Sequence, residues 1–194
     1  MVDGAKAESC IVTTPYENLH ILPSSLDLAA AELEISDKKG RESILKNALL
    51  PIKQYYDYII IDCPPSLGLI TTNALTASDT FLVPIQCEYY ALEGLTQLMS
   101  TVRRIKRQYN NTIDIEGVLL TMYDGRLNLT QQVVEEVKKF FPRKVFKTVI
   151  PRGVRLSEAP SFGMPVIYYD KNCKGSITYT ELAKEIIAKE RSYE

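Results

Sequence analysis

A single carboxylate, Asp62, stands at the end of the unbroken apolar run Ile59-Ile60-Ile61. A run of β-branched residues favours a strand that is buried on both faces, as in a parallel sheet. Pro64 and Pro65 follow, and because proline lacks an amide donor and restricts the residue before it, they end both strand and helix. Ligands of open α/β sheets bind outside the carboxyl ends of the strands. The pattern predicts a phosphate or metal site at Asp62; the alternative is a buried strand that an aspartate merely caps.

Apolar runs and helical periodicity alternate along the rest of the chain. Strands are expected at residues 19–22, 58–61, 80–85, 115–122 and 145–150, an extended segment at 165–169, and helices around 26–33, 43–54, 68–77, 89–109, 128–141, 154–159 and 176–189. Asn73 is expected to face back toward the strand ends. Alternating strands and helices imply right-handed crossovers and a mostly parallel sheet. We therefore expect one α/β domain over residues 1–194, doubly wound, with helices on both faces of the sheet.

The composition is that of an ordinary soluble globular domain, with 194 residues, 45% hydrophobic and 24% charged. The net charge of −1 hides an asymmetry, because residues 138–174 contain nine basic and only two acidic side chains. This basic quarter predicts a surface that faces a polyanion, or else cations scattered over several faces. A second basic run lies off the apolar stripe of helix 89–109 and is either a solvated face or a binding surface: Arg103, Arg104, Lys106 and Arg107.

Cysteine and histidine usage argues against a zinc site. The four cysteines show no CxxC spacing, and His20 is the one histidine. Reduced thiols in a cytosolic protein are the expected state. No apolar run approaches the length of a membrane span, and no signal-peptide pattern opens the chain.

Four separated motifs, IIIDCPPSLG, VPIQCEYYALEGL, LLTMYDGR and VIPRGVRLSEAPSFG, together resemble the ParA/Soj family of chromosome-partitioning ATPases. These are P-loop proteins of the deviant Walker A group, related to MinD, and the resemblance runs from about Asn18 to Ile187. It implies a doubly wound α/β domain that uses ATP and Mg²⁺ and forms an ATP-bound homodimer. It also implies DNA binding without sequence preference, a ParB/Spo0J-type partner protein, and a cytoplasmic, nucleoid-associated location.

The resemblance assigns roles to the residues around the predicted strand end. Asp62 is similar to the family's Walker B-like, switch II aspartate, which acts catalytically on the magnesium side through water. Pro64, Pro65 and Ser66 match the switch that senses the terminal phosphate of the nucleotide.

Further along the chain, the resemblance places Pro151 and its neighbours beside the adenine. Most members have Asn where this chain has Gly153, and a glycine cannot supply that side-chain amide. Arg126 and Arg155 match positions linked to DNA binding, and the neighbouring Arg152 is expected to bind DNA as well.

The family's nucleotide site also needs a glycine-rich loop whose amides hold the phosphates. No two of the nine glycines lie within five residues of each other, and none begins a GKT or GKS. Because this loop and the switch I aspartate lie upstream of Asn18 in the family, we expect the chain to be a C-terminal portion of such a protein, inactive alone as an ATPase. Residues 58–61 would then lack a neighbouring strand.

Two other functions remain open. The first is a non-enzymatic fragment that binds nucleic acid through its basic residues. The second is a MinD-like ATPase associated with the membrane. Residues 181–194 carry three basic and four acidic side chains, which argues against docking on an anionic membrane.

Overall fold

The computed structural model describes residues 1–88 and 91–190, and these divide into two compact units. One unit contains residues 1–80 and 98–114, and the other contains residues 81–97 and 115–194. The single domain over residues 1–194 stays a prediction, and each unit is described by itself below. No helix among the described residues is long and apolar enough to cross a membrane.

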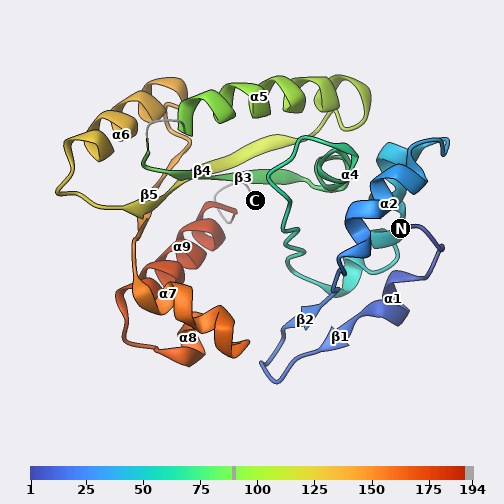
Figure 1. Cartoon of the computed structure of the whole chain (residues 1–194), viewed down its shortest axis with the longest axis horizontal. Helices are drawn as coiled ribbons and strands as arrows, with labels where there is room; N and C mark the ends of the chain where they lie inside the picture. The colour runs from blue at the N-terminus through green and yellow to red at the C-terminus, as the bar shows by residue number, and fades with distance from the viewer. Residues whose placement is uncertain (89–90, 191–194) are drawn as a thin grey trace. The chain divides into compact units, whose positions relative to one another are not determined.

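The second unit is built on a three-stranded sheet in the order β3-β4-β5 (Figure 1). The strands are β3 (Thr80–Gln86), β4 (Asp114–Tyr123) and β5 (Val145–Pro151), and the sequence predicts all three. Strands β4 and β5 are parallel, with Val118 opposite Val145 and Tyr123 opposite Pro151. A parallel pair requires a crossover, and α6 (Asn128–Phe140) supplies it.

Helices cover this sheet on both faces, with α6 on one side and α9 (Lys174–Glu190) on the other (Figure 1). Helix α9 contributes Leu182 to a core with Leu119, Phe146 and Ile150. Its Glu185 carboxylate accepts hydrogen bonds from the amides of Lys147 and Thr148 at 2.8 and 3.0 Å, which satisfies two backbone donors of β5. The expected α/β architecture with a parallel sheet between helices is confirmed.

The segment between β5 and α9 differs from the prediction. It folds as α7 (Val154–Glu158), a 3₁₀ turn, η3 (Ala159–Phe162), and α8 (Val166–Tyr169). The sequence predicts an extended segment at residues 165–169, and this prediction is wrong. The Pro165 carbonyl instead accepts from the amides of Tyr168 and Tyr169 at 2.9 and 3.0 Å, which closes a helical turn.

The first unit is largely helical. It opens with α1 (Ala7–Cys10) and a short antiparallel pair, β1 (Val12–Thr13) and β2 (His20–Ile21). The remaining elements are α2 (Asp27–Ile35), η1 (Arg41–Ser43), α3 (Ile44–Leu49), η2 (Lys53–Tyr55), α4 (Leu69–Ala77) and the later part of α5 (Ala91–Gln108). The sequence predicts a start of α5 at residue 89, which lies outside the described residues. The helix predicted at residues 43–54 is interrupted by a turn at residues 50–52, which contains Pro51 and separates α3 from η2.

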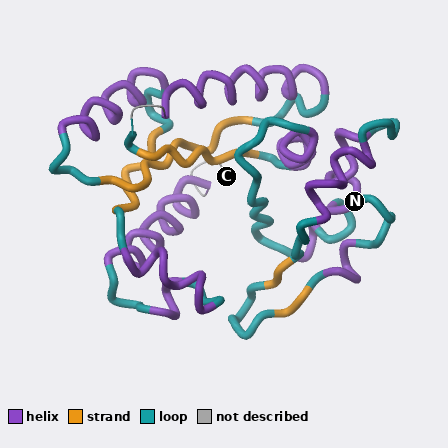
Figure 2. The backbone as a smooth tube through the Cα atoms, in the orientation of Figure 1, coloured by secondary structure: helices purple, strands orange, loops and turns teal. Residues whose placement is uncertain are grey.

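The predicted buried strand at residues 58–61 is wrong. These residues belong to no strand, and Figure 2 draws them as loop before α4. Ile60 is 92% exposed, whereas Ile61 packs against the buried cluster of Ala7, Leu49 and Ile52. A parallel strand is buried on both faces when it lies inside a sheet that helices cover on both sides, and residues 58–61 belong to no sheet among the described residues.

Asn73 does not face a strand end as expected, because it ties helical segments together. Its side chain is fully buried, accepts from the Leu45 amide at 3.1 Å and donates to the carbonyls of Arg41 and Leu69 at 2.7 and 3.0 Å. These bonds join α4 to η1 and α3, and they satisfy a polar group that would otherwise be costly to bury.

Candidate functional site

The first group of predicted site residues, Asp62, Pro64, Pro65 and Ser66, lies with Cys63 in the first unit, between residues 58–61 and α4. All five residues are exposed. Packing of Ile61 against the cluster of Ala7, Leu49 and Ile52 fixes the residue that precedes Asp62. At the other end, the Thr71 hydroxyl donates to the Ser66 carbonyl at 2.5 Å. Asp62 therefore presents a solvent-accessible carboxylate, the type of oxygen ligand that Mg²⁺ prefers, either directly or through water.

A carboxylate that the sequence did not single out lies at the start of α4. Glu32, from α2, accepts a short hydrogen bond from the Leu69 amide in the first turn of α4. A Cβ atom at Gly68 would collide with this carboxylate in its present position, so a larger residue here would have to displace the Glu32 side chain. The negative charge at a helix N-terminus is favourable. The first turn of α4 is thus capped from within the chain.

Cys63, next to Asp62, is a poor nucleophile in this setting. Its thiol donates to the Ile61 carbonyl at 3.7 Å. Although the residue is exposed, partial burial of the thiol, together with the charge of Asp62, raises the pKa of Cys63 above its ordinary value. Because the thiolate is the reactive form, a raised pKa disfavours chemistry at this sulfur.

The second group of predicted residues gathers at one edge of the sheet in the second unit. The amide of Cys87, directly after β3, donates to the Thr121 carbonyl in β4 at 3.2 Å, and Tyr123 lies opposite Pro151. The carboxyl ends of β3, β4 and β5 therefore lie side by side, where open α/β sheets bind ligands. Pro151 is buried, and Gly153 precedes α7 in an extended backbone conformation.

Two of the predicted DNA-contacting arginines at this edge are paired with carboxylates. Arg126 donates from Nε and Nη2 to both oxygens of Asp124, at 2.8 and 2.6 Å. This bidentate pair holds the pKa of Asp124 at about 2, below its ordinary value of 3.8. Arg152 lies 3.8 Å from Glu88, which directly follows Cys87.

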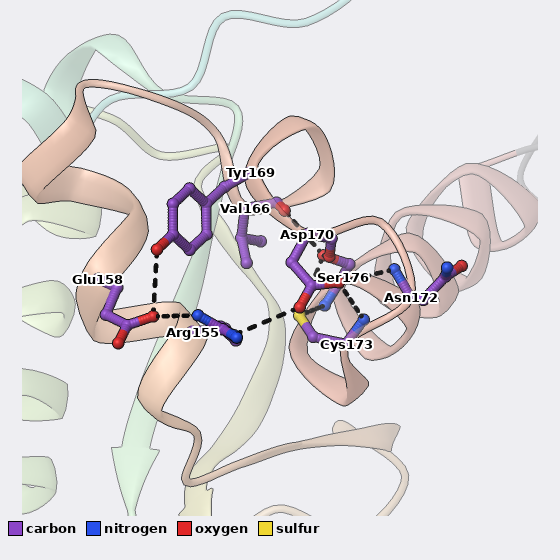
Figure 3. Close-up of polar contacts among 8 residues, drawn as sticks. All are labelled: Arg155, Glu158, Val166, Tyr169, Asp170, Asn172, Cys173 and Ser176. Carbon is purple, nitrogen blue, oxygen red and sulfur yellow. Dashed lines mark hydrogen bonds and ion pairs between the residues drawn. The ribbon is translucent and has the colours of Figure 1, made fainter.

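Arg155 is held more closely still (Figure 3). Its Nη1 donates to Glu158 at 2.8 Å, its Nε lies 3.4 Å from Asp170, and its guanidinium stands 5.9 Å from the centre of the Tyr169 ring. The Tyr169 hydroxyl donates to the same Glu158 oxygen at 3.2 Å. Asp170 also accepts a hydrogen bond from the amide of Cys173 at 3.1 Å. Arg155 is therefore linked through Asp170 to the residue that precedes α9.

The structure thus brings Arg126, Arg152, Pro151 and Gly153 to one sheet edge, with Arg155 in the adjoining α7. Residues 62–66 belong to the other unit. Sequence reasoning missed the carboxylate partners. Two of these partners could have been found from sequence spacing. Asp124 lies two residues before Arg126, and Glu158 lies three residues after Arg155. Glu88 has no such local signal.

Within the described ranges, no group of three or more His, Cys, Asp or Glu side chains could hold a metal ion.

Comparison with known proteins identifies the class of fold to which this chain belongs. A family model described as an AAA domain matches residues 1–115. Cobyrinic acid a,c-diamide synthase from Mycobacterium smegmatis, solved with bound ADP and magnesium, is 32% identical to this chain. Its TM-score is 0.83, with 100% of this chain and 71% of that chain covered. The fold is that of the P-loop NTPases.

Two relatives narrow the class to a family. The chain is 58% identical over 188 residues to the sporulation initiation inhibitor protein Soj of Bacillus subtilis (strain 168), covering 97% of this chain and 74% of Soj. It is 48% identical over 186 residues to the chromosome-partitioning ATPase Soj of Treponema pallidum (strain Nichols), covering 96% and 74%. The chain belongs to the Soj/ParA family of chromosome-partitioning proteins, as its motifs predicted.

Proposed function

We propose that this protein acts in chromosome or plasmid partitioning as a nucleotide-dependent, DNA-binding homodimer, associated with the nucleoid in the cytoplasm. The observation that carries the proposal is the identity of 58% with Soj over 97% of the chain, which includes both groups of candidate residues. A ParB/Spo0J-type protein is the proposed partner.

The proposed nucleotide site uses Asp62 on the magnesium side, through water. Pro64, Pro65 and Ser66 would sense the terminal phosphate. The exposed carboxylate of Asp62 fits magnesium, and a neighbour of the same fold was solved with ADP and magnesium. Magnesium would neutralise the charge that develops during phosphoryl transfer. The 194 residues contain no glycine-rich GKT or GKS stretch to hold the phosphates.

The proposed adenine contact is made by the backbone near Pro151, since Gly153 has no side chain to donate. Arg126, Arg152 and Arg155 are proposed to bind DNA phosphates. Each already has a carboxylate nearby, so a bound phosphate competes with that carboxylate for the guanidinium. The net gain in affinity from each of them is then smaller than that from an arginine with no carboxylate partner.

The test uses a chimaera in which a family P-loop segment precedes this chain. Asp62→Ala should lower magnesium-dependent ATP hydrolysis by roughly 10- to 100-fold, the usual cost of losing a group that acts on a metal through its outer shell. Asp57→Ala, at an exposed carboxylate five residues earlier, is the matched control and should leave turnover unchanged. Equal turnover in both variants would show that Asp62 has no catalytic role.

A non-enzymatic DNA-binding module is the second candidate. It is favoured by one observation, the lack of a GKT or GKS stretch in the sequence. Magnesium-dependent ATP hydrolysis by the chimaera, lowered by Asp62→Ala, separates the two candidates. The 194-residue chain alone is not expected to hydrolyse ATP in either case, because a phosphate site without amide and lysine donors cannot stabilise the transition state.

A further inference from the structure

The last part of α5 carries a row of polar side chains on one face, which we call the arginine stripe: Ser100, Arg103, Arg104, Arg107 and Gln108. Their spacing of three and four residues aligns them along the helix. On the opposite face Val102 and Ile105 are buried, with 4% and 0% exposure, while the three arginines are exposed. Burial of one face therefore fixes the direction in which the stripe points.

The three arginines of the stripe have no ion-pair partner among the described residues. Neighbouring Lys106 adds a fourth positive charge and is also exposed. Cations in the last turn of a helix are favourable because of the helix dipole, and this accounts for Lys106 and Arg107. It does not account for Arg103 and Arg104, which precede the last turn. Like charges three and four residues apart repel each other, so an anion bound here would relieve that repulsion.

The stripe lines a surface hollow of about 300 Å³, and its lining residues are all polar. Guanidinium groups, a serine hydroxyl and a glutamine amide are the donors that proteins use for phosphate oxygens. Protein–protein interfaces, in contrast, have an apolar centre, and no apolar residue lines this hollow among the described residues. The chemistry favours the phosphates of a nucleic acid over an acidic protein surface.

We propose that the arginine stripe of α5 is a second DNA-binding surface, which contacts the phosphate backbone without reading sequence. The inference rests on the proposed function, because DNA is the proposed partner, but it assigns the contact to residues that lie outside both candidate groups. From residue 100 to residue 108 the stripe spans about 12 Å. Duplex DNA carries about seven phosphates over that length, enough for all three guanidiniums.

The experiment measures binding of the 194-residue chain to fluorescently labelled duplexes of two unrelated sequences, at about 0.05 to 0.3 M salt. At about 0.1 M salt, counterion release raises the affinity about eightfold for each phosphate that the protein neutralises. The triple change Arg103→Glu, Arg104→Glu and Arg107→Glu should therefore weaken binding to both duplexes by up to about 500-fold. The log–log salt slope should become shallower by about 0.9 for each phosphate that the variant no longer neutralises.

Two further variants control for charge and folding. The charge control is a triple variant at exposed positions of the same unit: Lys6→Glu, Lys39→Glu and Lys46→Glu. It changes the net charge by the same amount as the triple Arg→Glu variant of the stripe, and it should weaken DNA binding far less. The triple Arg→Gln variant keeps strong helix formers on α5 and should lose affinity with an unchanged circular dichroism spectrum.

Three results would overturn the inference. They are wild-type affinity in the stripe variants, an equal loss of affinity in the lysine control, and no DNA binding either by the unmodified chain or by the chimaera with ATP. If Arg126→Glu with Arg155→Glu abolishes binding while the stripe variants do not, the proposed function stands and the inference fails. Magnesium-dependent turnover of the chimaera and its Asp62→Ala variant is measured independently of DNA binding, so a failure of the proposed nucleotide function is seen separately.

Discussion

Two sets of arginines in this chain have the same side chain and opposite surroundings. Arg126, Arg152 and Arg155, near the carboxyl ends of β4 and β5, each lie within 3.8 Å of a carboxylate oxygen. In the arginine stripe of α5, no described carboxylate makes an ion pair with a guanidinium. The first set is largely neutralised within the fold, and the second is available to an external anion.

The difference shows why counting charges along a window is misleading. The window 138–174 has nine basic and two acidic residues, yet Lys139 pairs with Glu136 at 2.5 Å and Arg152 with Glu88 at 3.8 Å. Both of these carboxylates lie outside the window. A surface that binds DNA is defined by charge that remains after folding, because only that charge can release counterions from DNA.

The largest gain in DNA affinity is expected from removing the carboxylates at the sheet edge. Asp124→Asn with Glu88→Gln should free Arg126 and Arg152 for phosphate. Two newly neutralised phosphates would raise DNA affinity by up to about 60-fold at about 0.1 M salt, and the salt slope would steepen by about 1.8. Fluorescence anisotropy over a salt series measures both quantities.

The control for that variant is Asp37→Asn with Asp57→Asn, which removes equal charge from exposed carboxylates in the other unit. An equal gain in affinity from both double variants would mean that net charge alone governs binding. The distinction between paired and available arginines would then have no functional meaning.

A smaller effect is expected on the free energy of unfolding when the end of α5, which carries the arginine stripe, loses its hydrogen bonds to neighbouring backbone. Asn110, two residues after α5, is 7% exposed and donates to the carbonyls of Leu75 and Ser78 at 3.0 and 2.7 Å. Asn110→Ala leaves these acceptors without that donor, which should lower the free energy of unfolding by about 2 kcal/mol, or roughly 30-fold in the folding equilibrium.

Urea denaturation of Asn110→Ala and of its exposed neighbour Asn111→Ala checks this expectation. Only the first should shift the midpoint. Similar midpoints for the two variants would mean that the end of α5 is not anchored through Asn110, and that the direction of the stripe depends on apolar packing alone.

Much of the fold could be predicted from the sequence because several elements carry their own signal. Strands β4 and β5 are apolar runs of suitable length, and α6 and α9 have clear helical periodicity. The prediction for residues 165–169 failed because so short a segment does not allow periodicity to distinguish strand from helix. The prediction for residues 58–61 failed for a different reason, since burial of a strand depends on partners that are distant in the sequence.

The candidate site could be located only in part. Asp62 and Arg126 stand out by motif, and Asp124 is close enough to Arg126 in the sequence to have been recognised as its partner. The partner of Arg152 could not be predicted, because Glu88 reaches it only through the alignment of β3, β4 and β5. Whether an arginine is available is therefore a property of the tertiary structure.

The smallest expected effect on stability comes from the pairing of Asp124 with Arg126, because the pair is exposed to water, where ion pairs contribute little. The pairing should instead be visible in the titration of the Asp124 carboxyl. Since the pKa of Asp124 in the fold is about 2, below the ordinary 3.8, the pair stabilises the fold fully above the ordinary pKa. That contribution is lost as the pH falls through the pKa of about 2 in the fold. Carbon-detected NMR of the Asp124 carboxyl should show the low midpoint, and Arg126→Gln should move it upward, whereas Arg103→Gln should not. A midpoint near the ordinary 3.8 in the unmodified chain would mean that Arg126 is not held by Asp124 in solution, and the two sets of arginines would then be equally available to DNA.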